Sequence, residues 1–318
     1  MNTDSSNPVS RAENRDSKQA AIFAPFTDEC AKPGPRLGSH LSVAGGLENA
    51  FHEAVRLGCD CVQLFVKNQR QWRAKPLTPE QVERFRMAAE QTAIRPAVAH
   101  GSYLLNLASP CEAARRQSVE ALTDEFDRCA ALGIPYLVVH PGASLNADLP
   151  IALANVARSL NELYDERGGA TTMVLLETTA GQGSSVGHRF EHLWEILEGV
   201  IQRERVGVCL DTCHLFAAGY DFRTPESYRD MIAQLDRAIG LALVKCIHLN
   251  DSKRELGSRI DRHEHIGKGK IGKEGFRHFV NDPRFRDVPM ILETPKGKDG
   301  RGTDLDKVNL KRSRALIY

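Results

Sequence analysis

Histidine and carboxylate side chains recur where short apolar runs of this sequence end. Six of them close or nearly close successive runs: His100, His140, Glu177, Asp211, His248 and Glu293. His214 follows in CLDTCHLF, and the loop RIDRHEH (259 to 265) adds Asp261 and His263, with His265 as a further candidate. Imidazole and carboxylate groups are the usual protein ligands of divalent transition metals. These residue types therefore predict a metal site.

A structural role would explain any one of these residues, but it does not explain the set. Carboxylates gathered in one place repel one another and are costly to bury unless cations neutralise them. Four carboxylates and five imidazoles exceed the three or four protein ligands of a single metal ion. We therefore expect two or three ions, and mixed nitrogen and oxygen ligation without cysteine favours zinc or manganese over calcium or magnesium.

Clustered divalent ions support a particular chemistry. They lower the pKa of bound water from about 15.7 to about 7, and they can stabilise both the attacking and the leaving oxygen of an in-line phosphoryl displacement. The ligand set alone therefore predicts hydrolysis of a phosphate ester. It does not say which ester is the substrate.

The elements that must position these residues are eight strand-like runs, each followed by a helix-like or mixed segment. The runs span residues 37–42, 61–67, 95–100, 135–140, 172–177, 205–211, 243–249 and 288–293. Helical spacing is clear in 78–92 and in 111–132, which ends before Gly133. This alternation predicts an α/β fold, a (β/α)8 TIM barrel whose active site lies at the C-terminal ends of the strands.

The domain organisation follows from composition. Residues 1–36 are polar and end in AKPGPR, so we predict a disordered N-terminal tail before a single barrel domain over 37–318. The tail resembles neither a secretory nor an organellar presequence, and the apolar runs are too short to span a membrane. The eight cysteines are scattered without a CxxC pair, which predicts reduced, mostly buried thiols and a cytoplasmic protein.

Charge and loop composition bear on the substrate. The net charge of +1 argues against a general nucleic-acid coat, so any polyanion site must be local. VKNQRQWRAK (66 to 75) places Lys67, Arg70, Arg73 and Lys75 around Trp72, which predicts either phosphate contacts or a solvated basic turn.

Two further loops carry distinct signals. HGSYLLNLAS (100 to 109) presents three large side chains after a proposed ligand, which suits an apolar wedge with one of the three packed in the core. TTAGQGSSVGHRF (178 to 190) has GxGxxxG spacing rather than GxGxxG, so we predict no nucleotide cofactor and favour a close backbone approach to a phosphate.

Several of these stretches together resemble the endonuclease IV family of apurinic/apyrimidinic-site DNA endonucleases. They are SHLSVAGGLENA, KNQRQWR, HGSYLLNL, VVHPGAS, LLETTAGQGSSVG, GVCLDTCHLFAAGYD, IHLNDSK, GSRIDRHEHIG and ILET, in the family's order from about Leu37 to Glu293. The chain departs at Gly101, where some family members carry an acidic residue, and in its basic C-terminal end KRSRALIY.

The resemblance implies a DNA repair hydrolase with a trinuclear zinc site, with manganese as an alternative ion. Its ligands would be His100, His140, Glu177, Asp211, His214, His248, Asp261, His263 and Glu293. By similarity, Glu177 bridges two ions and is the catalytic carboxylate. Arg70, Gln71, Tyr103 and Leu104 would enter the DNA at the lesion.

The implied activity is cutting of the phosphodiester bond 5′ to an abasic site in double-stranded DNA, leaving a 3′-hydroxyl and a 5′-deoxyribose phosphate, with removal of 3′-blocking groups. A monomer suits this task. Two other interpretations stay open: a divalent-metal sugar isomerase of the barrel type, and a non-catalytic lesion-binding protein. An isomerase would need neither His100, His140 and His214 nor the basic loop, and a binder would bend DNA without cutting it.

Overall fold

The computed structural model describes Met1 and residues 34–318, so the predicted tail over 1–36 lies almost wholly outside the described residues. Within the described part, eight parallel strands close a barrel in the order β1-β10-β7-β6-β5-β4-β3-β2. These strands are β1 Arg36–His40, β2 Cys61–Leu64, β3 Ala97–His100, β4 Tyr136–Val139, β5 Met173–Glu177, β6 Val206–Asp211, β7 Val244–His248 and β10 Pro289–Leu292. The predicted TIM barrel is confirmed.

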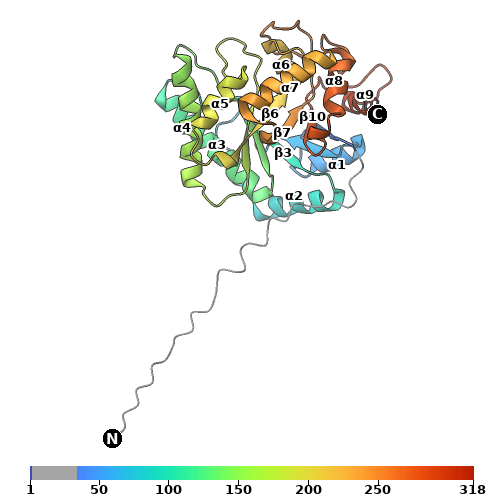
Figure 1. Cartoon of the computed structure of the whole chain (residues 1–318). Helices are drawn as coiled ribbons and strands as arrows, with labels where there is room; N and C mark the ends of the chain where they lie inside the picture. The colour runs from blue at the N-terminus through green and yellow to red at the C-terminus, as the bar shows by residue number, and fades with distance from the viewer. Residues whose placement is uncertain (2–33) are drawn as a thin grey trace. The chain divides into compact units, whose positions relative to one another are not determined.

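The α-helices lie around the outside of the strands (Figure 1). They are α1 Asn49–Leu57, α2 Pro79–Thr92, α3 Glu112–Leu132, α4 Leu149–Glu166, α5 Phe190–Glu198, α6 Thr212–Ala218, α7 Pro225–Ile239, α8 Gly272–Val280 and α9 Leu305–Arg314. Short 3-10 turns lie at Arg203–Arg205, Leu241–Leu243 and Pro283–Phe285.

The two helices predicted from spacing form as expected. Thr78 caps α2 through a capping box with Gln81, and Pro79 occupies the first turn, where its missing N–H costs nothing. Gly133 ends α3 in the left-handed conformation, with φ of 76°. Local capping chemistry therefore fixes the length of both helices.

Two apolar layers hold the barrel together. The interior is filled by side chains from strands around the barrel: Cys61, Val98, Val138, Leu175, Cys209, Cys246 and Ile291. A larger core packs between the strands and the helices. Strands that are buried on both faces have continuous apolar sequences, so they can be recognised from the sequence.

The cysteines behave as predicted where the structure describes them. Seven are free thiols, and all of these except Cys111 are buried. Cys30 lies outside the described residues. Among the described helices, none is long and apolar enough to cross a membrane.

The loop after β7 contains an element that the sequence did not predict. Strand β8 (Asp251–Ser252) pairs antiparallel with β9 (His263–Glu264) to form a two-stranded sheet. The Asp251 carboxylate accepts hydrogen bonds from the backbone N–H groups of Gly269 and Ile271, at 3.0 Å each. This long loop is thus tied down at both ends, and it presents His263 at a defined place on the rim.

Candidate functional site

Glu177 lies at the centre of the predicted ligands. Its side chain is fully buried at the end of β5, and four imidazoles surround its carboxylate. His100 Nε2 and His140 Nε2 lie 3.2 and 3.0 Å from Oε2, and His248 Nδ1 and His214 Nδ1 both lie 3.2 Å from Oε1. The two oxygens of Glu177 therefore face two different groups of ligands.

Eight of the nine predicted ligands form three overlapping groups. His100, His140 and Glu177 make the first, and Glu177, Asp211, His248 and Glu293 the second. Asp211, His214 and His263 make the third, beside which Asp261 and His263 also group with Cys213. In each group the ligand atoms lie within 4.8 Å of one another. All nine predicted ligands therefore converge on one mouth of the barrel.

Hydrogen bonds to backbone carbonyls orient three of the candidate histidine ligands. The Nδ1 atoms of His100, His214 and His263 donate to the backbone carbonyls of Gly101, Thr178 and Glu293, at 2.8, 2.8 and 3.1 Å. In the neutral ring, such bonds fix the tautomer and leave the lone pair on Nε2.

Two of these free nitrogens are unsatisfied. The Nε2 atoms of His214 and His263 are buried without a hydrogen-bond partner among the described residues. Both nevertheless lie close to the carboxylate of Asp261, at 3.1 and 3.2 Å. Buried polar atoms are normally paired, so these two fit ligands of a divalent cation.

The electrostatics of the site favour ionised carboxylates. Burial alone would raise the pKa of Glu177, but His140 and His248 hold it well below its ordinary range. Burial likewise opposes the charged form of His263, yet Asp211 and Asp261 raise its pKa to about 9. Protons on the imidazoles and bound cations are therefore alternative ways to balance the charge of these carboxylates.

Three residues of the site were missed from the sequence. Gln63 accepts from His248 Nε2 at 2.8 Å and donates to Glu293 Oε1 at 2.6 Å. Asn250 donates to Asp211 Oδ2 at 2.6 Å, and His40 Nδ1 lies 3.4 Å from Glu293 Oε1. His40 ends β1, so the strand-end rule used for the other ligands would have found it.

The structure separates His263 from His265. The Nδ1 atom of His265 lies 3.0 Å from the side-chain nitrogen of Asn309, on α9, and His265 belongs to none of the three ligand groups. His263 contributes to the site because it lies on β9, whose pairing with β8 holds it at the mouth. The structure thus brings His263, and not His265, to the other candidate ligands, and its role as a ligand stays a prediction.

The predicted wedge residues divide as expected between surface and core. Tyr103 is 64% exposed beside the ligands, with its ring centroid 5.6 Å from that of His100, whereas Leu105 is 7% exposed and packs in the core. Leu104 is half-buried, and Arg70 and Gln71 are exposed. The residues proposed to contact DNA therefore remain available at the surface.

Lys67 corrects one expectation. The prediction of a basic loop counted it among the phosphate-contacting cations, but its side chain is only 2% exposed and pairs with Asp124 and Glu125. Arg73 fits the expectation better, with a side chain 91% exposed. The two residues differ because Lys67 lies just after β2, where the chain still packs against α3, whereas Arg73 lies farther along the loop.

Hydrogen bonds join neighbouring loops around the mouth. The Asn106 side chain both donates to and accepts from the backbone of Ala143. Gln182 in turn accepts from the backbone N–H of Asp261 at 3.0 Å. The glycine-rich loop over 181–187 therefore packs against other rim loops, and its predicted approach to a phosphate stays a prediction.

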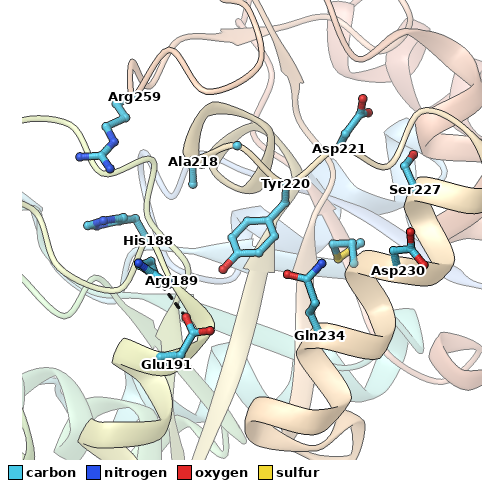
Figure 2. A pocket seen from close by; sticks show the side chains of 12 residues that line it. His188, Arg189, Glu191, Ala218, Tyr220, Asp221, Ser227, Asp230, Gln234 and Arg259 are labelled. Atoms are coloured by element: carbon cyan, nitrogen blue, oxygen red, sulfur yellow. Dashed lines mark hydrogen bonds and ion pairs between the residues drawn. The ribbon is translucent and has the colours of Figure 1, made fainter.

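Two hollows differ in their relation to the candidate ligands. One, of about 430 Å³, is lined by the ligands His100, His140, His214 and Asp261 together with wedge residues. A second, of about 460 Å³, is lined by residues near the start of α5, near the end of α6 and on α7 (Figure 2). In that view His188, Arg189 and Arg259 lie on one side of Tyr220, and Gln234 and Asp230 on the other. None of the nine candidate ligands lines the second hollow, so only the first can hold a reacting group beside them.

Among solved structures, one similar protein shares both the fold and much of the sequence of this chain, and another shares the fold alone. Endonuclease IV from Thermus thermophilus superposes with a TM-score of 0.78 at 41% identity, covering 89% of this chain and 98% of that one. A D-tagatose 3-epimerase-like protein superposes with a TM-score of 0.67 at 19% identity, covering 88% of this chain and 96% of that one. The second likeness shows the shared barrel alone.

Sequence comparison agrees with the first of these. Residues 51–312 match the family described as a xylose isomerase-like TIM barrel. A probable endonuclease 4 of Chloroflexus aurantiacus is 52% identical over 89% of this chain and 98% of its own length. One of Geobacter sulfurreducens is 46% identical over 88% of this chain and 94% of its own length. The chain therefore belongs to the endonuclease IV family.

Proposed function

We propose that this chain hydrolyses the phosphodiester bond 5′ to abasic sites in double-stranded DNA, leaving a 3′-hydroxyl and a 5′-deoxyribose phosphate, and also removes 3′-blocking groups. As a member of its family it is an endonuclease that acts on DNA. The observation that carries the proposal is the convergence of nine metal-ligand side chains beside the exposed wedge residue Tyr103. Residues 37–318 would carry this activity as a monomer.

Three zinc ions would occupy the site, with manganese as an alternative. His100 and His140 would hold the first ion, Asp211, His248 and Glu293 the second, and Glu177 would bridge the two. His214, Asp261 and His263 would hold the third. Such ions lower the pKa of water and stabilise negative charge on phosphate oxygens. Gln63, His40 and Asn250 would orient the ligands that they contact, as outer hydrogen bonds do in metal sites.

Selection of the lesion would rest on the cost of flipping a nucleotide. An abasic nucleotide has no base to unpair or unstack, so it leaves the duplex for less than the few kcal/mol that an intact nucleotide costs. Tyr103 and Leu104, with Arg70 and Gln71 on the adjoining loop, would fill the gap and keep the duplex kinked. The hollow of about 430 Å³ beside the ligands would receive the sugar and its phosphate.

The pKa values predict how metal binding depends on pH. Because the pKa of His263 is about 9 in the metal-free site, this imidazole is protonated at neutral pH, and a metal ion must displace that proton. We expect zinc added to stripped protein in weak buffer to release protons, and zinc affinity to rise as the pH approaches that pKa from below. Calorimetry in buffers of different ionisation enthalpy measures the release. Binding without proton release would contradict this assignment of His263.

The proposed specificity can be tested with matched duplexes. Two labelled duplexes differ only in one nucleotide, which is abasic in the first and intact in the second. We expect cutting of the first duplex only, at the lesion. Equal cutting of both would refute the proposed selection, and binding of the abasic duplex without cutting would favour a non-catalytic lesion-binding protein. Interconversion of an aldose and a ketose by the same preparation would favour the sugar-isomerase interpretation.

A further inference from the structure

A buried ion pair lies beneath the two loops that carry the proposed wedge residues. Lys67 follows β2 and Glu125 lies on α3, and their side chains are 2% and 1% exposed, with 3.3 Å between Nζ and Oε1. A buried charge pair is costly to desolvate, so it adds little to stability by itself. The hydrogen bonds of the two side chains instead connect them to the backbone of both loops.

Lys67 and its neighbours hold the first loop, residues 66–75, against α3. The Lys67 ammonium donates to the backbone carbonyl of Trp72 at 3.1 Å and to that of Ala121, on α3, at 3.2 Å. Arg128, also on α3, donates to the carbonyl of Lys75 at 2.7 Å. Arg70 and Gln71 thus project from a loop whose backbone is fixed on both sides of them.

Glu125 holds the second loop, residues 101–106. Its carboxylate accepts from the backbone N–H of Ser102 at 3.1 and 3.3 Å. Gly101 leaves room for this approach, since a Cβ there would lie 3.2 Å from Glu125 Oε2 and 2.9 Å from Val139. Tyr103 and Leu104 follow this anchored residue directly.

The two loops also meet each other. The Ser102 hydroxyl donates to the carbonyl of Gln69 at 2.7 Å. The preceding peptide group serves the metal site as well, because the Gly101 carbonyl accepts from His100 Nδ1. Glu125 therefore anchors the second loop, which the Ser102 hydroxyl joins to the first, whereas the bond between His100 and Gly101 does not involve Glu125.

We propose that Glu125, through its ion pair with Lys67, is a positioning residue that sets the distance between the two wedge loops and so determines cutting of lesions in duplex DNA. This inference rests on the proposed function. The pair lies outside the nine ligands and touches no reacting group. Its effect is therefore confined to substrates that must be bent and opened.

The test compares Glu125→Gln with the matched variant Glu162→Gln. Glu162, on α4, pairs with Arg115, a buried cation on the same helix as Glu125, and among the described residues its carboxylate is hydrogen-bonded to Arg115 rather than to either loop. Glu125→Gln keeps an acceptor for Ser102 and removes the more deeply buried of the two carboxylate charges that face Lys67, the other being that of Asp124. Because displacement of reacting groups by about 1 Å can cost about 100-fold, we expect kcat/KM on an abasic duplex to fall about 10- to 100-fold.

Two other substrates separate positioning from general damage. Cutting of a single-stranded abasic oligonucleotide and of bis(4-nitrophenyl) phosphate should stay within about twofold of wild type in both variants, because neither substrate needs a duplex to be opened. If Glu125→Gln lowers all three rates by the same factor, or leaves duplex cutting unchanged, the inference is wrong. Failure of the wild type to cut any abasic substrate would instead refute the proposed function.

A spectroscopic readout reports the loop directly. The chain has two tryptophans, so Trp72 becomes the single reporter in a Trp194→Phe background. There Glu125→Gln should shift the emission of Trp72 to longer wavelength, and Glu162→Gln should not. If Glu125→Gln does not fold, Ser102→Ala removes the bond between the loops and leaves the ion pair intact. It should lower duplex cutting selectively, and an unchanged duplex rate would refute the inference.

Discussion

Glutamine in place of Glu177 is expected to lower cutting of an abasic duplex by more than about 100-fold. Loss of a residue that merely orients a ligand typically costs about 10- to 100-fold, and Glu177 faces two ligand groups directly with both oxygens. An amide has nearly the same shape but no charge to hold two cations together. Steady-state rates on a labelled duplex, with metal content measured on the same sample, check this result.

Glu264→Gln is the matched control for this variant. Glu264 lies on β9 at the same rim, beside His263, but belongs to none of the ligand groups. Its variant should cut at close to the wild-type rate. A Glu177→Gln protein that holds its full metal content and still cuts at the wild-type rate would show that Glu177 does not bridge two ions.

Removal of the metal ions is expected to abolish cutting and to lower the melting temperature. Four carboxylates meet at the mouth, and Glu177 and Asp211 among them are fully buried, so without cations their repulsion is balanced only by protons on the imidazoles. We expect about three equivalents of metal per chain before prolonged chelation with phenanthroline. Adding zinc back should restore both activity and melting temperature.

The two neighbouring histidines of the rim loop provide the control for metal content. His263→Ala should lose about one equivalent of metal, and His265→Ala should lose none, because only His263 faces the ligands. Metal analysis of both purified variants tests the assignment of the third ion. A single equivalent of metal in the wild type, or full cutting after verified metal removal, would contradict a multi-metal site.

The sequence predicted the barrel well for a physical reason. Barrel strands such as β5, which contains Leu175, are buried on both faces. They therefore form short apolar runs that contrast with the amphipathic helices between them. Six ligands could be found by one rule, since each closes or nearly closes such a run. His140 and Glu293 lie one residue beyond their strands, a shift that leaves both at the mouth.

The remaining features depend on contacts between segments far apart in the chain. In the sequence, Gln63 is a single polar residue inside an apolar run, which does not indicate a role. Its role depends on closure of the barrel, which places its side chain between His248 and Glu293. The burial of Lys67 depends on α3, which comes much later in the chain, and the composition of its own loop suggested the opposite. Sequence patterns predict which residues share an edge, whereas tertiary packing decides which charges stay exposed.

Mapping the ends produced from one lesion tests the proposed function most directly. A duplex with a single tetrahydrofuran analogue of an abasic site is incubated with the protein before and after metal removal. We predict a cut immediately 5′ to the analogue, with a 3′-hydroxyl, that disappears on stripping and returns with zinc. The analogue cannot undergo β-elimination, so such ends identify hydrolysis. Binding without cutting, in protein that holds its full metal content, would contradict metal-dependent hydrolysis by this site.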